Sequence, residues 1–457
     1  MGNDKEDHIL HVMAQGQIRV AVLGNVDAGK STLIGTLTQN TLDDGNGSSR
    51  QCVLKYPHER ASGRTSTITQ HFMAFNDKGE TIVLPKGNKI AGKNYYTQGD
   101  LAAQAHRTVS LMDLAGHEKY FKTTVHGLSR GMADYALVLV NASQGMTYMS
   151  HHHLQLVQMC GIPAIVVLTK MDAVPGRDVI QHTRRTVTEA IRTTLGKKRF
   201  AIRGSADIDR VVVADPQLSA LAPVVEVSCV TGHGLDLVRR LLHQLPPRRR
   251  HFQKMSRPLE VLLEDTFQVP GVGLILSGFV NAGRIEKGGT MYLGPLKNGT
   301  YIKTMAKSIH VAQTSVDQAW AGHSACFAVN LTKAQRKMLT HHQTKKKGMV
   351  LLGQEPTAPV YGFTAEICLS KGDSTFIKGQ TNSTIHILHV KTACRLVDFD
   401  TMAGNGTTVV LRPGQRATAT FEFLQGPQHV RKGMRVILRD GHVRGIGIIR
   451  ALHHHKF

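Results

Sequence analysis

Gly24-Asn25-Val26-Asp27-Ala28-Gly29-Lys30-Ser31 separates an apolar run, Ile18–Leu23, from a stretch with helical periodicity. The glycines let backbone N–H groups wrap around phosphate oxygens, Lys30 supplies a positive charge, and Ser31 offers a hydroxyl to Mg²⁺. A helix that begins near Ser31 would add the positive end of its dipole. The pattern therefore predicts a P-loop. The residues expected to contact the nucleotide here are Gly24, Asn25, Val26, Asp27, Ala28, Gly29, Lys30, Ser31 and Thr32.

Apolar runs alternate with helix-like stretches throughout residues 18–247. Each run is followed by turn residues and then by an amphipathic segment, which is typical of a mostly parallel sheet with helices on both faces. Ligands of such sheets bind at the carboxyl ends of the strands. Motifs that follow these strands should therefore meet at one edge. The predicted strands are Ile18–Leu23, Thr108–Met112, Tyr135–Val140, Ala164–Leu168 and Val224–Val227.

A second motif, Asp113-Leu114-Ala115-Gly116-His117-Glu118, comes directly after the strand predicted at 108–112. A carboxylate at this place can hold a metal ion, and the N–H of Gly116 can contact a γ-phosphate. His117 is placed to orient an attacking water molecule. Taken alone, the motif also fits an ordinary Asp-Gly turn with a surface histidine. The predicted catalytic residues are His117, Lys30 and Gly116.

The choice of base is predicted to depend on Thr169-Lys170-Met171-Asp172, again at the end of an apolar strand. The carboxylate of Asp172 can accept two hydrogen bonds from N1–H and the amino group of guanine, a donor pair that adenine lacks. Lys170 would pack its stem along the base. The alternative is a surface Lys and Asp in a loop. The other predicted guanine contacts are Thr169 and, from backbone N–H groups after the strand at 224–227, Ser228, Cys229 and Val230.

The segment His58–Thr65 lies between the first two motifs and contains a hydroxyl candidate for the metal. Thr65 would be ordered only while a γ-phosphate is present, which is how such a segment becomes a switch. Arg64 could act as a catalytic arginine, although an exposed Arg that meets RNA phosphate is the simpler interpretation. The five motifs occur in the order that a GTPase requires, so the expected cofactors are GTP or GDP and Mg²⁺. The predicted metal ligands are Ser31, Thr65 and Asp113.

The residue pattern of the chain changes after Pro246-Pro247-Arg248-Arg249-Arg250. Glycines then recur every few residues between short runs rich in Val, Ile and Thr, which predicts closely spaced strands and two β-barrels. The expected fold is an α/β P-loop GTPase domain followed by two β-barrel domains. The expected boundaries are an N-terminal tail at 1–17, the GTPase domain at 18–247, a linker at 248–257, and barrels at 258–355 and 356–457.

The chain of 457 residues carries a formal charge of +23, which favours nucleic acid or an anionic membrane as partner. No apolar run approaches the ~18 residues of a membrane span, and the polar N-terminus argues against a secretory signal. We therefore expect a cytoplasmic monomer that contacts RNA. The contacts should be mainly to the RNA backbone, because aromatic residues make up only 5% of the chain.

Six scattered cysteines form no CxxC pair. Histidine runs at 151–153, 341–342 and 453–455 fit surface positions better than metal sites.

These residues resemble the translational GTPases of the elongation factor Tu and elongation factor one-alpha class, most closely the GTP-binding protein one and two subfamily. The similarity runs from about 18 to 450 and includes Arg19–Leu33, Ser62–Ser66, Asp113–Tyr120, Val269–Gly278 and Val443–Ile449. It implies Mg²⁺-dependent GTP hydrolysis stimulated by the ribosome, with His117 positioning water and Val26 in an apolar gate. It also implies the ribosome and tRNA as partners, or a role with mRNA decay machinery.

Three positions depart from the class pattern. Thr169 replaces an Asn that braces the phosphate loop, so nucleotide affinity could be lower. Arg64 replaces an apolar gate residue, and residues 76–107 form an insertion without an assigned role. Three alternatives stay open: a slow GTP-switched protein that binds RNA or decay machinery, a GTPase subunit of sulfate activation, and a selenocysteine-specific factor. The basic charge counts against the second, and the expected fourth domain counts against the third.

Overall fold

The structure is a computed structural model in which two compact units, Met1–Arg250 and His251–Phe457, are described separately. The division lies within the stretch expected to be a linker. Thr65, Arg64, Glu118 and the histidines at 341–342 lie outside the described residues. The described ranges are 2–14, 16–54, 68–83, 97–117, 121–129, 133–248, 251–339, 348–356, 358–369, 375–379, 381–401, 410–440 and 442–456.

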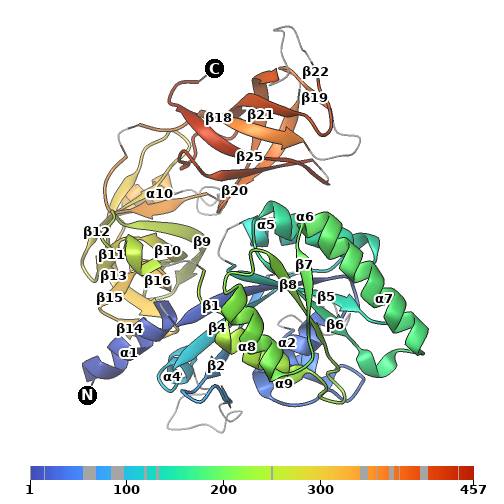
Figure 1. Ribbon diagram of the computed structural model, residues 1–457. Helices are drawn as coiled ribbons and strands as arrows, with labels where there is room; N and C mark the ends of the chain where they lie inside the picture. Colours follow the sequence, from blue (N-terminus) through green and yellow to red (C-terminus); the bar gives the residue numbers. More distant parts are fainter. Residues whose placement is uncertain are drawn as a thin grey trace. The chain divides into compact units, whose positions relative to one another are not determined.

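The first unit contains an eight-stranded sheet with helices on both faces (Figure 1). The strand order is β3-β2-β4-β1-β5-β6-β8-β7, and all neighbours are parallel except β2 with β3 and β4. The α/β prediction is thus confirmed, and all five predicted strands are present. The strands are β1 Gln17–Gly24, β2 Thr69–Phe75, β3 Thr81–Ile82, β4 Arg107–Asp113, β5 Tyr135–Asn141, β6 Ala164–Thr169, β7 Lys198–Ile202 and β8 Leu221–Glu226.

One apolar core of this unit lies between a face of the sheet and three helices. Leu33 of α2, Val211 of α8 and Leu241 of α9 belong to one apolar cluster with inward-facing strand residues such as Val20 and Val167. These residues recur every second position along β1 and β6, as expected for strands that turn alternate side chains to one face. The longer helices are α2 Lys30–Gln39, α5 Phe121–Ser129, α6 Tyr148–Met159, α7 Arg177–Ala190, α8 Ser205–Ala214 and α9 Leu235–Gln244.

The segment assigned to an N-terminal tail contains a helix, α1 Gly2–Ala14. Ile9, Leu10, Val12 and Met13 on this helix are buried. Val12 packs against a small cluster that includes residues of the 76–107 insertion, which contributes β3 and the short helix α4 Gln98–Ala102. The helix forms because its apolar residues fall on one face and find a partner there. One role of the insertion is therefore to cover this helix.

The second unit contains two closed β-barrels (Figure 1). This confirms the prediction based on glycines that recur between short runs rich in Val, Ile and Thr. The first has the order β12-β17-β9-β10-β16-β13 and closes through a β12–β13 pairing, with β14 added at β13. Its strands are β9 Glu260–Val269, β10 Gly273–Ala282, β12 Thr290–Gly294, β13 Ile302–Val311, β14 Thr314–Val316, β16 Ser324–Val329 and β17 Val350–Leu352, beside the pair β11 Arg284–Glu286 and β15 Gln318–Trp320.

The second barrel has the order β18-β23-β21-β20-β24-β25. Its interior is filled by alternating strand residues, among them Phe363 and Phe421, whose rings stack 5.3 Å apart. His453, the first residue of the terminal histidine run, belongs to β25 and lies 2.8 Å from the hydroxyl of Thr364. The strands are β18 Gly362–Leu369, β20 Asn382–Ile387, β21 Val390–Thr401, β23 Arg416–Phe423, β24 Arg435–Asp440 and β25 His442–His453, beside the pair β19 Phe376–Ile377 and β22 Val410–Leu411.

Within the described ranges, no helix is long and apolar enough to span a membrane, and no group of three His, Cys, Asp or Glu side chains could hold a metal ion.

The histidine run at 151–153 was expected to lie at the surface, but one of its residues does not. His153 on α6 is fully buried, and burial lowers its pKa to about 3. It is therefore a neutral core residue and not a surface group.

Candidate nucleotide-binding site

The phosphate loop joins the end of β1 to the start of α2. Gly29 adopts φ = +81°, a left-handed conformation that favours glycine, and α2 begins at the next residue. The free N–H groups of the first helical turn therefore face the loop, where an anion would also meet the positive end of the helix dipole. The sequence predicted this succession of strand, loop and helix.

Lys30 is held within this loop. Its ammonium donates a 2.9 Å hydrogen bond to the carbonyl oxygen of Asn25, and the residue is only 8% exposed. Burial lowers the pKa of Lys30, whereas the nearby carboxylates of Asp113 and Asp27 act in the opposite direction. The loop thus encloses a cation whose desolvation is offset in part by two acids, and an incoming polyphosphate would add further compensation.

Ser31 and Asp113 come together at the edge of the sheet. The hydroxyl of Ser31 donates a 2.8 Å hydrogen bond to a carboxylate oxygen of Asp113, which is fully buried. They meet because β1 and β4 are parallel neighbours with Val22 opposite Asp113, so both strands end at the same edge. Two of the three predicted metal ligands are therefore adjacent, and the third, Thr65, lies outside the described residues.

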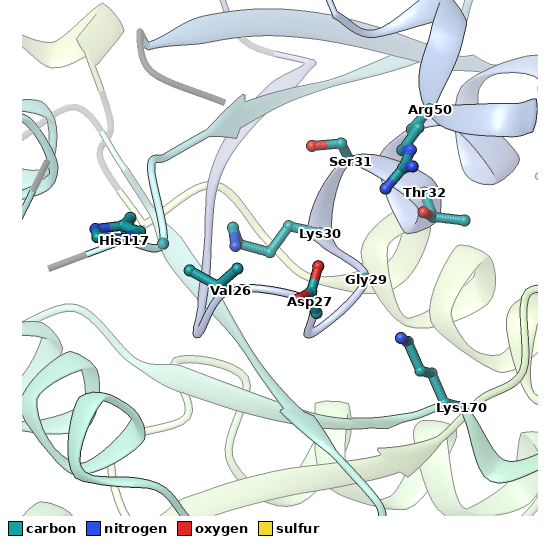
Figure 2. Close-up of a pocket in the computed structure, with 10 residues that line it drawn as sticks. Val26, Asp27, Gly29, Lys30, Ser31, Thr32, Arg50, His117 and Lys170 are labelled. Carbon is teal, nitrogen blue, oxygen red and sulfur yellow. The ribbon is translucent and has the colours of Figure 1, made fainter. Parts of the chain in front are cut away.

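Gly116 lies directly against the phosphate loop. A Cβ atom added at this residue would come within 2.5 Å of the carbonyl oxygen of Gly24 and 2.3 Å of the Lys30 ammonium. Only glycine permits so close an approach of the two loops. The next residue, His117, lines the same pocket as Val26 and Lys30 (Figure 2). The proposed water-orienting group and the proposed gate residue thus share one cavity.

The loop after β6 is tied to the phosphate loop. The hydroxyl of Thr169 donates a 2.9 Å hydrogen bond to the carbonyl oxygen of Ala28. We expected weaker support of the phosphate loop because Thr169 replaces an Asn. The threonine hydroxyl nevertheless makes a contact with this loop. Lys170 follows in a left-handed conformation with φ = +59° and lines the pocket, while Asp172 is exposed.

The loop after β8 is a tight turn around Ser228. Its hydroxyl accepts hydrogen bonds from the N–H groups of Val230 and Thr231, at 3.2 and 3.0 Å. The carbonyl oxygen of Cys229 accepts a hydrogen bond from the N–H of Asp43, and burial raises the pKa of the Cys229 thiol to about 11. Cys229 is therefore a neutral packing group, and only the backbone of this loop is suited to bind guanine.

The phosphate loop lines a pocket, and one residue of this pocket belongs to none of the motifs read from the sequence. Arg50 lies in a short 3₁₀ helix, Ser48–Cys52, between α2 and the switch segment. The turn signal at Asp43–Gly47 could have drawn attention to this segment, but nothing in the sequence relates it to the pocket. The lining residues are Val26, Asp27, Gly29, Lys30, Ser31, Thr32, Arg50, Gly116, His117 and Lys170.

Comparison with protein families matches residues 15–248 to the elongation factor Tu GTP binding domain. The chain is also 30% identical over 436 residues to GTP-binding protein 2 of Mus musculus, covering 94% of the chain and 68% of that relative. This chain belongs to the translational GTPase superfamily. The resemblance inferred from the P-loop and the motifs after it is thereby confirmed.

Further relatives extend the comparison beyond the first unit of this translational GTPase. GTP-binding protein 1 of Xenopus laevis is 31% identical over 438 residues, which cover 95% of the chain, and the chain spans 63% of the length of that relative. Elongation factor SelB of Methanococcus maripaludis, solved with the GTP analogue GppNHp, has a TM-score of 0.64 at 18% identity over 96% of the chain and 80% of SelB. At this identity the likeness to SelB shows the fold alone.

Proposed function

We propose that this chain binds GTP with Mg²⁺ and hydrolyses it to GDP and phosphate in a step linked to the ribosome. The observation that carries the proposal is a single pocket lined by Lys30, Gly116 and His117, with the Ser31–Asp113 pair at the same sheet edge. Charge stabilisation for the phosphates and a group that can orient water are thus in one place.

The residues where β4 ends and α2 begins fit a magnesium ion. A serine hydroxyl and a buried carboxylate, 2.8 Å apart, are the hard oxygen donors that Mg²⁺ prefers beside phosphate oxygens. Ser31 and Asp113 would hold the ion, and Thr65 is proposed as its further ligand. When bound, Mg²⁺ would offset negative charge on the β- and γ-phosphates.

The chain's own residues supply the rest of the chemistry. Lys30 offsets charge on the phosphates, and the N–H of Gly116 is available to a γ-phosphate oxygen. His117 can accept a hydrogen bond from a water molecule and hold it for attack on the γ-phosphorus. As the water oxygen bonds to this phosphorus, the bond from the phosphorus to the β–γ bridging oxygen breaks. The bridging oxygen stays with GDP, and the water proton leaves with the inorganic phosphate. Guanine is selected by Asp172, with the backbone of Ser228–Val230 at its O6.

The proposed partners are RNA and the ribosome. The charge of +23 favours phosphate backbones. The relatives include factors named for elongation, and one carries the name of a selenocysteine-specific elongation factor. We infer a cytoplasmic monomer whose ligand is tRNA or an mRNA decay complex.

The test is a GTPase assay with and without ribosomes, repeated with charged and uncharged tRNA. Ribosomes should accelerate hydrolysis, and His117→Ala should remove most of this acceleration because the attacking water would lose the group that orients it. His151→Ala, on the exposed side of α6, is the matched control and should behave as wild type. Equal rates in wild type and His117→Ala would refute the mechanism. Nucleotide-dependent ribosome binding with negligible turnover would instead support the slow switch.

A further inference from the structure

Arg50 is a cation at the nucleotide pocket that no sequence motif accounts for. It lines the pocket together with Lys30 and Lys170 (Figure 2). Lys30 and Lys170 belong to recognised motifs, whereas Arg50 comes from the segment that connects α2 with the switch. Arg50 is half-buried, and withdrawing part of a guanidinium from water is unfavourable without an acceptor for its hydrogen bonds.

A network of backbone hydrogen bonds fixes the turn that carries Arg50. One carboxylate oxygen of Asp43 accepts hydrogen bonds from the N–H groups of Gly45 and Gly47, both at 3.1 Å, and the other accepts one from Ser49 at 2.9 Å. The N–H of Asp43 itself bonds to the carbonyl oxygen of Cys229. The turn is therefore attached to the loop proposed to bind guanine.

The opposite side of the turn is packed against the phosphate-binding helix. A Cβ atom added at Gly35 of α2 would lie 2.0 Å from the carbonyl oxygen of Ser49, so the backbones are in close contact. Gly47 has φ = +88°, and a Cβ atom there would lie 2.6 Å from Nε of Arg50. The two glycines thus make room for the turn and for the arginine side chain. The turn that carries Arg50 is therefore held on one side by the loop at Cys229 and on the other by α2.

The Arg50 guanidinium retains hydrogen-bonding capacity that an anion in the pocket could use. Its Nε is buried and has no hydrogen-bond partner in the described part of the chain, and no ion pair between Arg50 and a described carboxylate is present. A buried donor without a partner is unfavourable, and a planar guanidinium matches two phosphate oxygens at once. The pocket it lines is the one proposed to bind phosphates.

The place of Arg50 in the pocket indicates which phosphates it would meet. In Figure 2 its side chain lies beside Ser31 and Thr32 at the first turn of α2, and His117 lies on the other side of Lys30. We infer that Arg50 binds the phosphates that GDP and GTP share and so holds both nucleotides, without acting on the γ-phosphate. The inference rests on the proposed binding of guanine nucleotides.

Calorimetric titration of the full chain with GDP and with GppNHp, in Mg²⁺ buffer, tests this assignment. Arg50→Ala should raise the Kd for both nucleotides by about 10- to 100-fold, the range for a lost charge-assisted hydrogen bond. Arg50→Lys keeps the charge but not the planar guanidinium, so its Kd values should lie between those of wild type and Arg50→Ala. Arg210→Ala removes an equally charged but 74% exposed side chain of α8 and should leave both values unchanged.

The outcomes separate this inference from the proposed function. If wild type binds neither nucleotide, the proposed function is wrong and the role of Arg50 falls with it. If wild type binds both and Arg50→Ala binds equally well, only the role of Arg50 is wrong. A loss confined to GppNHp would also overturn it, because the arginine would then act at the γ-phosphate. Should Arg50→Ala not fold, as judged by circular dichroism, Arg50→Gln carries the same comparison.

Discussion

The hydroxyl of Thr169 at the end of β6 donates a hydrogen bond to the carbonyl oxygen of Ala28 in the phosphate loop, at 2.9 Å. Both residues are buried, with 2% and 1% of their surface exposed. They are 141 positions apart in the sequence and meet because the strands that precede them end at one edge of the sheet. This bond joins the loop expected to recognise the base to the loop expected to hold the phosphates.

Thr169→Val should loosen this connection while keeping the shape of the side chain. The loss of a buried hydrogen bond should lower the free energy of unfolding by about 1–2 kcal/mol and weaken GDP binding several-fold. Denaturant unfolding and GDP titration measure the two effects. Thr169→Ser keeps the hydroxyl and serves as the control. Equal GDP affinity in the Val and Ser variants would show that the bond does not support the nucleotide site.

Gly116→Ala should disturb the phosphate loop, because the new methyl group would lie 2.5 Å from the backbone oxygen of Gly24. One loop must move, so we expect GppNHp affinity to fall by about tenfold or more, with a larger loss of hydrolysis. Gly176→Ala is the matched control, since no atom lies within 4 Å of the added Cβ and its φ is extended. Binding by Gly116→Ala as tight as that of the control would contradict the close contact.

The helix α1 provides a test of the structure outside the site. Leu10 is fully buried, and Leu10→Ala should lower the free energy of unfolding by about 2–5 kcal/mol. The neighbouring His11 is exposed, so His11→Ala should change stability by less than about 0.5 kcal/mol. Denaturant unfolding of both variants decides the matter. Similar stabilities would mean that the helix does not pack as the structure shows.

The contrast between α1 and the phosphate loop shows what the sequence could reveal. Five of the six interior strands, β1, β4, β5, β6 and β8, are largely apolar runs, so their positions and the sheet edge they share could be predicted. Strand β7 lies at the edge of the sheet and begins with the polar pair Lys198-Arg199. It therefore lacks the apolar run by which the other strands could be predicted. The apolar face of α1 is short and follows a polar start. Its burial depends on an insertion of about thirty residues much further along the chain.

Arg50 could not have been found from the sequence for a related reason. Four of the five recognised motifs follow strands, and a sheet places strand ends predictably. Arg50 follows no strand. Its place depends on the bond from Asp43 to Cys229 and on close contacts at Gly35 and Gly47, all of which are tertiary. An arginine in a turn-rich segment is by itself indistinguishable from a solvated surface group.

A charge cluster around the buried Glu260 joins the two barrels of the second unit and predicts a pH dependence of stability. Glu260 on β9 is paired with His429, 2.9 Å away, and with Arg431, 2.6 Å away, both from the segment before β24. Burial alone would raise the pKa of Glu260, but the hydrogen bond from His429 and the charge of Arg431 outweigh it and lower the pKa to about 2. The folded protein thus favours the ionised carboxylate more than the unfolded chain does.

Because the folded pKa is depressed, this carboxylate stabilises the protein above the unfolded pKa of ~4.5 and loses its contribution as the pH falls toward 2. Its size is about 3 kcal/mol at neutral pH. Glu260→Gln should therefore be less stable than wild type at pH 7, and the difference should shrink between pH 4.5 and 2. Urea unfolding of the full chain across this range measures it. Glu366→Gln breaks an exposed pair with Arg450 and should change little. A difference between Glu260→Gln and wild type that stays constant with pH would show that the carboxylate is not selectively ionised in the folded state.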